Sequence, residues 1–145
     1  MLQPAPSKEA VWLGTYFRKE ILSHHLPEVS VRWIDERMGW GVFAERNFKA
    51  MEFIAEYTGV VRKRKRSDRT NAYCFEYFPD PYVIDAQDQG GLARYINHSE
   101  TANLVSAPAW IDGVLHIILY TKHPVLKNSQ LCYDYGPDYW KHRKK

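Results

Sequence analysis

Residues 94–103 concentrate side chains that could do chemistry. The segment has the sequence RYINHSETAN and combines two amides, a histidine, hydroxyl groups and an arginine just after a Gly-Gly pair. Polar groups that are buried without hydrogen-bond partners cost about 1–3 kcal/mol each. The segment is therefore either a solvated loop, which is common for Asn-, Ser- and Thr-rich sequence, or the lining of a site that supplies the partners.

A pair of tyrosines near the C-terminal end forms a second candidate group. Tyr133 and Tyr135 flank Asp134 in the run QLCYDYG, which covers residues 130–136. Successive side chains of a strand point to opposite faces, so both tyrosines are expected on one face and Asp134 on the other. Tyrosines at this spacing are ordinarily core or surface residues, and Asn97 could close a turn through its own backbone. Neither group identifies a site by itself.

Two glycines flank a single residue in the run Gly39, Trp40 and Gly41. Glycine permits a tight turn and lets another group approach the backbone closely. A Gly-x-Gly sequence usually belongs to an ordinary hairpin, and the longer glycine patterns of dinucleotide and phosphate sites are absent from the sequence. The prediction is a hairpin without a nucleotide phosphate site.

Short strands are expected to position these groups. Apolar patterns predict strands within residues 29–34, 52–61, 71–78, 82–86, 114–120 and 130–136. One helix is also predicted, capped by Ser7 and stopped by Pro27. The residues that it carries, with an apolar period near 3.6, are Val11, Trp12, Thr15, Tyr16, Lys19, Ile21 and Leu22. Many short strands with one helix predict a mainly β, β-rich α+β fold.

Three histidines outside residues 94–103, His24, His25 and His116, are interpreted as structural. His116 lies inside the strand predicted at 114–120, which is expected to be buried on both faces, so it is interpreted as a core histidine with a hydrogen-bond partner. His24 and His25 end the predicted helix, where protonated side chains suit the helix dipole. No metal site is predicted.

Composition favours one compact globular domain. The chain has 145 residues, of which 45% are hydrophobic and 14% aromatic. An apolar run of about eighteen residues is absent and the N-terminus lacks a signal-peptide pattern, so no membrane association is expected. Cys74 and Cys132 are interpreted as buried free thiols of a reducing compartment, although the two could bridge. Two cysteines are too few for a zinc cluster.

Five consecutive cations, Arg62, Lys63, Arg64, Lys65 and Arg66, follow the strand predicted at 52–61. Like charges repel and resist burial, so a solvated loop is one interpretation. A phosphate-bearing or acidic partner and a nuclear localisation signal are the others. The sequence leaves these alternatives open.

The order of short motifs along the chain resembles the SET-domain protein lysine methyltransferases. The motifs are GWGVFA at 39–44, YTG at 57–59, YCF at 73–75, RYINHS at 94–99 with Asn103, and LCYDYG at 131–136. Each is of limited specificity alone, whereas the NHS block followed by the YDYG block is specific. The resemblance implies small sheets around a knot-like C-terminal core. It divides the chain into a helical segment (1–28), the SET domain (29–136) and a short tail (137–145).

The resemblance also implies an S-adenosylmethionine cofactor and a role for each matching residue. Tyr135 corresponds to the catalytic tyrosine, Tyr73 to a catalytic wall of the lysine channel, and Tyr133 to the position that limits the methyl count, so mono- or dimethylation is expected. The residues that would hold or cover the cofactor are Gly39, Trp40, Gly41, Arg94, Asn97, His98 and Trp140. Among these, the Asn97 amide would meet the amino-acid end of the cofactor.

The chain departs from the family pattern at several positions. Glu100 and Ala102 stand where many members have cysteine and proline, and no cysteine cluster follows Gly136. Something other than a zinc-bound segment must then cover the adenine. Trp140, with Tyr139, is the candidate because an indole can stack on a purine.

The partners that the resemblance implies are a histone or another lysine-rich basic tail. Nucleosomal DNA could contact the cations from Arg62 to Arg66, and a homodimer or the substrate could complete the thin wall of the peptide groove. The expected location is the nucleus or chromatin, the cytoplasm of a bacterium, or a host to which the protein is secreted. The alternative function is a catalytically weak SET-like module that binds a protein or nucleic acid.

Overall fold

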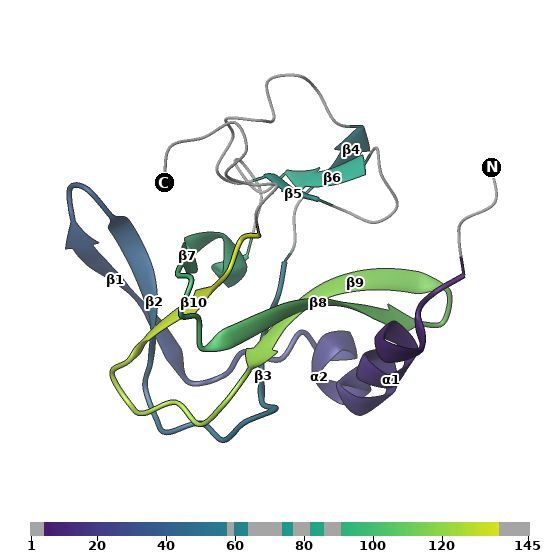
Figure 1. Ribbon diagram of the computed structural model, residues 1–145, viewed down its shortest axis with the longest axis horizontal. Coiled ribbons are helices and arrows are strands. Elements are labelled where there is room, and N and C mark those ends of the chain that lie inside the picture. The colour runs from purple at the N-terminus through teal and green to yellow at the C-terminus, as the bar shows by residue number, and fades with distance from the viewer. Residues whose placement is uncertain (1–4, 58–59, 64–73, 77–81, 86–90, 137–145) are drawn as a thin grey trace.

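The computed structural model describes residues 5–57, 60–63, 74–76, 82–85 and 91–136, and the strands between 60 and 85 are described by their backbone alone. The elements in chain order are α1 (Lys8–Tyr16), α2 (Arg18–Leu22), β1 (Val29–Asp35), β2 (Gly39–Ala44), β3 (Phe53–Glu56), β4 (Val60–Lys63), β5 (Cys74–Glu76), β6 (Tyr82–Asp85), the 3-10 helix η2 (Leu92–Tyr95), β7 (Asn97–His98), β8 (Leu104–Ile111), β9 (Val114–Thr121) and β10 (Gln130–Tyr133). The predicted strand-rich fold is confirmed (Figure 1).

Seven strands form one mixed sheet, and three form a second, antiparallel sheet. The large sheet has the order β1-β2-β10-β8-β9-β3, with β7 also paired to β10. It is mixed because β10 runs antiparallel to β2 but parallel to β7 and β8. The small sheet, ordered β4-β6-β5, stands apart from the large one in Figure 1.

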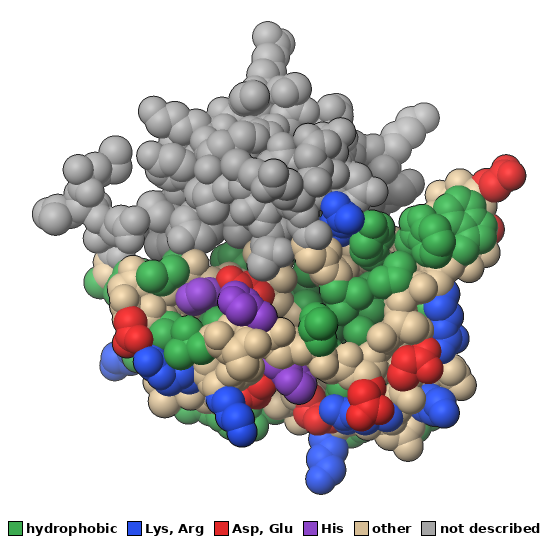
Figure 2. Space-filling model, turned by 180° about the vertical axis from the view of Figure 1, so that it is seen from behind, with side chains coloured by type: hydrophobic (Ala, Val, Ile, Leu, Met, Phe, Trp, Pro, Cys, Tyr) green, Lys and Arg blue, Asp and Glu red, His purple; other side chains and the backbone are tan. Residues whose placement is uncertain are grey.

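The predicted hairpin is formed by β1 and β2. Trp33 and Trp40 are cross-strand partners, and their rings contact edge to face with 5.4 Å between centroids. Gly39 has a φ of +72°, a conformation that glycine adopts without strain. The far end of the hairpin exposes Trp33, Met38 and Trp40, and apolar side chains gather there at the right of Figure 2. The hairpin therefore extends beyond the core.

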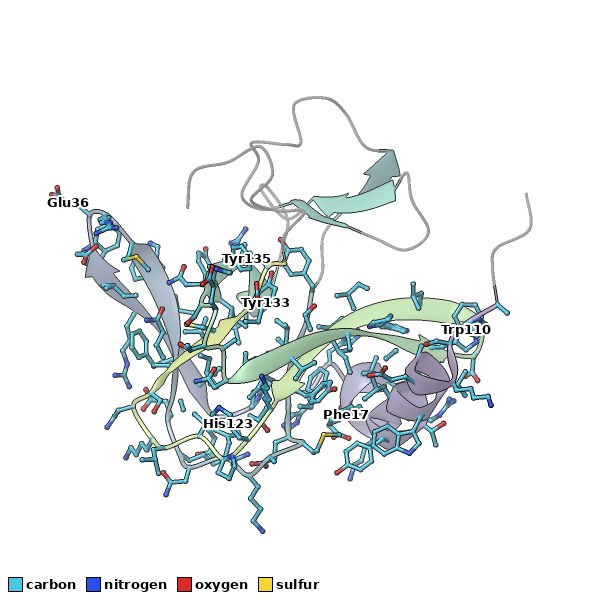
Figure 3. All side chains as sticks on the ribbon, viewed as in Figure 1. Phe17, Glu36, Trp110, His123, Tyr133 and Tyr135 are labelled. Atoms are coloured by element: carbon cyan, nitrogen blue, oxygen red, sulfur yellow. The ribbon has the colours of Figure 1, made fainter. Side chains whose placement is uncertain are left out.

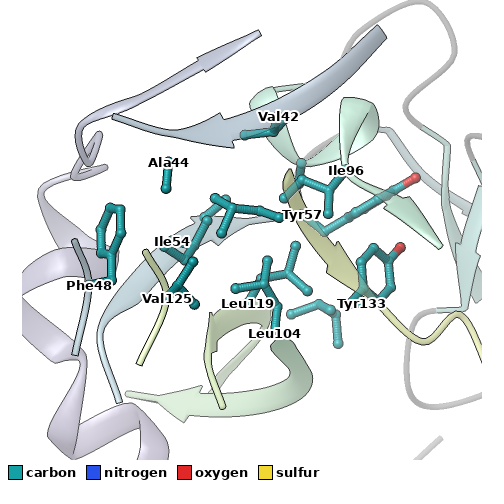
Figure 4. Packing of buried hydrophobic residues seen from close by; sticks show 14 residues of the cluster. Val42, Ala44, Phe48, Ile54, Tyr57, Ile96, Leu104, Leu119, Val125 and Tyr133 are labelled. Atoms are coloured by element: carbon teal, nitrogen blue, oxygen red, sulfur yellow. The ribbon is translucent and has the colours of Figure 1, made fainter. Parts of the chain in front are cut away.

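The strands β3, β8 and β9 separate two apolar clusters. The cluster on the β10 side is drawn in Figure 4, and its fully buried members include Val42, Ile54, Ile96, Leu119 and Leu131. On the other side, Phe17 packs between Phe53 and Tyr120, at centroid distances of 6.0 and 5.3 Å. Ile96 of the segment 94–103 and Tyr133 of β10 both belong to the cluster on the β10 side.

The N-terminal helix is confirmed, but its buried face differs from the predicted set. Ser7 caps α1 as expected, since its hydroxyl accepts a hydrogen bond from the Ala10 N–H at 3.0 Å. The helix then breaks at Phe17, and α2 follows. Trp12 and Tyr16 are 52% and 51% exposed and stack on each other. Of the predicted residues, Ile21 alone is buried, and the rest of the inward face consists of Ala10, Leu13, Gly14 and Phe17.

Small residues explain which face of α1 is buried. A Cβ at Gly14 would lie 1.9 Å from the backbone oxygen of Trp110 in β8, so the helix touches the sheet at this glycine. A bulky residue here would hold the helix away from the sheet.

Among the described residues, no helix is long and apolar enough to span a bilayer.

The histidine interpretation inside β9 is confirmed. His116 is partly buried, and its Nδ1 lies 2.7 Å from Oε2 of Glu56 on the neighbouring strand β3.

The strand β8, which pairs with β9 along its whole length, is absent from the predicted strands. Cys132 is a free, half-buried thiol whose pKa is raised by burial, and the side chain of Cys74 lies outside the described residues.

Replacement of Gly14 by Ala tests the helix contact. In a solvent-exposed helix this change is stabilising by about 1 kcal/mol, but here we expect a loss of about 1–3 kcal/mol because the added methyl group meets the Trp110 carbonyl. Denaturant unfolding measures the difference. Thr15→Ala, at the neighbouring exposed position, is the matched control and should change stability little. An unchanged or raised stability of Gly14→Ala would refute the contact.

Candidate active site

The strand β10 brings the two polar runs together. It runs parallel to β7, with Cys132 opposite Asn97 and Tyr133 opposite His98. The pairing continues beyond β7, where the Ser99 N–H donates to the Tyr133 carbonyl at 3.2 Å. The NHS and YDYG motifs, which are far apart in sequence, therefore lie side by side near the middle of the molecule (Figure 1).

Tyr135 is anchored to residues 94–103 at both its backbone and its hydroxyl. The hydroxyl donates to the carbonyl of Ile96 at 2.7 Å, and the backbone N–H donates to Nδ1 of His98 at 3.1 Å. Because Nδ1 accepts this bond, we infer that the neutral imidazole carries its proton on Nε2. The rings of His98 and Tyr135 also contact each other at 5.2 Å between centroids. The geometry fixes the direction of the Tyr135 hydroxyl.

Three tyrosines, Tyr57, Tyr133 and Tyr135, lie in or against the apolar cluster on the β10 side. Tyr133 and Tyr135 lie 4.7 Å apart, with an angle of 51° between their planes, and both are labelled in Figure 3. Tyr57 belongs to the same apolar cluster as Tyr133, and their side chains are 4% and 5% exposed. In Figure 4 the hydroxyls of Tyr57 and Tyr133 both lie on the side of the cluster away from Phe48. The arrangement gives an aromatic wall with polar tips.

Gly41 of β2 leaves room for side chains beside its backbone. The Asn97 side-chain nitrogen donates to the Trp40 carbonyl at 3.0 Å and to Oε1 of Gln130 at 2.9 Å. A Cβ at Gly41 would lie 2.7 Å from Cδ1 of Ile34, 2.9 Å from Oε1 of Gln130 and 3.3 Å from Nδ2 of Asn97. This glycine therefore leaves the space in which Asn97 and Gln130 meet.

Asn103 fastens β10 through its side chain. Its amide nitrogen donates to the carbonyl of Gln130 at 2.9 Å, and its amide oxygen accepts from the Cys132 N–H at 2.9 Å. One side chain thus makes the two bonds that a neighbouring strand would make. Asn103 appears in the predicted motif without a role, and Gln130 has no predicted role. The bonds of Asn103 to β10 and the bond between Gln130 and Asn97 connect segments far apart in the chain, so no local sequence signal indicates them.

The remaining predicted residues are only partly described. Arg94 lies in η2, where its guanidinium donates to the Tyr95 hydroxyl at 2.9 Å and covers the Tyr95 ring. Tyr73 and Trp140 lie outside the described residues. The same holds for the side chains of the cations Arg62–Arg66, although the backbone of the first two belongs to β4. Within the described part of the chain, no group of three His, Cys, Asp or Glu side chains could hold a metal ion.

Comparisons with known proteins agree with this geometry. The family model described as SET domain matches residues 39–136, which include all the motifs from the glycine pair to the YDYG block. The H3 lysine-4 specific histone-lysine N-methyltransferase of Emericella nidulans is 36% identical over an alignment of 105 residues, and the match covers 66% of this chain and 9% of that relative. The N-lysine methyltransferase KMT5A-B of Xenopus laevis is 36% identical over an alignment of 111 residues, and the match covers 68% of this chain and 33% of that relative.

A solved structure extends the comparison to three dimensions. The crystal structure of KRYPTONITE in complex with mCHG DNA and SAH has a TM-score of 0.63 and 29% sequence identity, and the match covers 74% of this chain and 23% of that one. This chain spans less than half the length of each of these three proteins. The matched family model nevertheless covers most of the chain. The resemblance seen in the motifs is confirmed, and the chain belongs to the SET domain family.

Proposed function

We propose that this chain is an S-adenosylmethionine-dependent protein lysine N-methyltransferase. The observation that carries the proposal is the pairing of β7 with β10, which sets Tyr133 and Tyr135 beside Asn97 and His98. Membership of a family whose matched relatives are named histone-lysine N-methyltransferases supports it. The substrate is then the amine of a lysine in a histone or another basic tail.

The reaction requires a neutral lysine amine. A free lysine has a pKa near 10.4, so its deprotonation at neutral pH costs about 4–5 kcal/mol. Aromatic walls exclude water and disfavour the ammonium form, which lowers the pKa of the amine. Tyr57, Tyr133 and, by family resemblance, Tyr73 would provide these walls. Arginine is a poor substrate because its guanidinium stays protonated.

The Tyr135 hydroxyl is suited to orient a positively charged reacting group. Its proton is directed at the Ile96 carbonyl, so the phenolic oxygen acts toward a ligand as a hydrogen-bond acceptor. When bound, S-adenosylmethionine supplies a methyl group on a cationic sulfur. An oxygen held in a fixed direction stabilises such charge without reorganisation during the reaction. His98 would act with Ile96 to keep Tyr135 in this position.

The cofactor-binding residues fit this chemistry. The Asn97 side chain and the Trp40 backbone meet beside Gly41, and His98 follows Asn97 on β7. We propose that the polar end of the cofactor binds beside Asn97, with Gly39 and Arg94 completing the set. Trp140 is proposed as the cover of the adenine, and the limits of the SET domain at 29 and 136 stay a prediction.

The proposed partners rest on charge and on the names of related proteins. Histones are the proposed substrates because matched relatives are named for histone-lysine methylation. Nucleosomal DNA is a proposed contact of Arg62–Arg66, and the structural neighbour was crystallised with DNA. A homodimer that completes the peptide groove and a location on chromatin are part of the same proposal.

Tyr135→Phe tests the proposed activity. Loss of the hydroxyl removes the bond to Ile96 and the acceptor oxygen, so we expect methyl transfer from labelled S-adenosylmethionine to histones to fall about 100-fold. Tyr16→Phe makes the same chemical change on the exposed face of α1 and should leave the rate unchanged. Equal labelling by the wild type and Tyr135→Phe would contradict the assigned role. Cofactor binding without transfer in the wild type would favour the non-catalytic module.

Tyr133→Phe tests the proposed limit on methylation. The Tyr133 side chain is 5% exposed and lies 4.7 Å from the Tyr135 ring. Removal of its hydroxyl should leave room for a bulkier methylated amine, because a smaller side chain relieves crowding. We expect mass spectrometry of a histone peptide to shift from mono- or dimethyl-lysine to a higher methyl count. An unchanged distribution of products would rule out Tyr133 as the limiting residue.

A further inference from the structure

We infer that Gln130 is a positioning residue that fixes the Asn97 amide in the orientation which selects the ammonium group of the cofactor. The inference rests on the proposed function, in which the amino-acid end of S-adenosylmethionine binds beside Asn97. The Gln130 side chain would act on the cofactor only through Asn97. Gln130 lies on β10, opposite Phe43 of β2.

The hydrogen bonds of Asn97 determine what its side chain can still bind. The side-chain amide has two N–H donors and one carbonyl acceptor. Both donors are committed in the structure, one to the Trp40 carbonyl at 3.0 Å and the other to Oε1 of Gln130 at 2.9 Å. Oδ1 is the group that remains for a ligand, and it can only accept. The side chain in this state prefers an ammonium group over a carboxylate.

Gln130 is placed to control this state. A backbone carbonyl can only accept, so the Trp40 bond requires nitrogen on that side of the Asn97 amide. Gln130 accepts from the second N–H and thereby restricts rotation of the Asn97 amide about its last side-chain bond. Gln130 is itself held at its backbone, where its carbonyl accepts from Asn103 at 2.9 Å.

The absent side chain of Gly41 makes the pair possible. A Cβ there would come within 2.9 Å of Oε1 of Gln130 and 3.3 Å of Nδ2 of Asn97. Contacts this short would push one of the two groups away. The second glycine of the Gly-x-Gly motif thus serves the Asn97–Gln130 contact in addition to any direct approach of a ligand.

The test compares two ligands across three proteins. The ligands are S-adenosylhomocysteine and an analogue in which the amine is replaced by hydrogen, and their Kd values are measured by titration calorimetry. The proteins are the wild type, Gln130→Met, which keeps the chain length without an amide acceptor, and Gln130→Glu, which keeps an acceptor oxygen. The ratio of the two Kd values isolates the contribution of the amine, because a folding defect affects both ligands equally.

We expect the wild type to bind the amine-bearing ligand more tightly than the analogue. In Gln130→Met this preference should fall about tenfold, while Gln130→Glu should retain it, because its carboxylate also accepts from Asn97. A preference unchanged in Gln130→Met, or lost equally in Gln130→Glu, would overturn the positioning role. A wild type that binds neither ligand would instead overturn the proposed function, and this inference with it.

Discussion

The fastening of β10 is the constraint on which the rest of the site depends. This strand pairs with β2 on one edge and with β7 and β8 on the other, and the Asn103 amide binds the backbone of Gln130 and Cys132. Backbone groups in a sheet need partners, so a strand with these bonds cannot shift without losing several at once. Tyr133 and Tyr135 are consequently held in a fixed register against residues 94–103.

Much of the fold could be predicted from local pattern, and the exceptions have physical causes. The continuous apolar run of β9 and the glycine-marked hairpin were sufficient signals. β8 gave a weak signal because Ser106 and Pro108 interrupt its apolar residues, yet pairing with β9 along its length makes it a strand. The apolar residues on which the helix was predicted are mostly exposed, because the buried face of α1 depends on the contact of Gly14 with Trp110, which is tertiary.

The candidate site could be predicted as a set of motifs but not as a set of contacts. The order of the NHS and YDYG blocks indicated the family, which the comparisons confirm. The parallel register that pairs Tyr133 with His98 is determined by strand packing, and neither sequence block contains a signal for it. The roles of Gln130 and Asn103 were missed for the same reason, since an isolated amide has many uses. Their partners became evident only from the hydrogen bonds.

We propose that the cofactor binds at the junction of β2, β7 and β10. Titration of S-adenosylhomocysteine into the wild type and Gly41→Ala tests this proposal, because the three atoms nearest to the added methyl group are ends of the side chains of Ile34, Gln130 and Asn97. We expect Gly41→Ala to stay folded and to bind this ligand at least about tenfold more weakly. A folded Gly41→Ala protein with the wild-type Kd would contradict it.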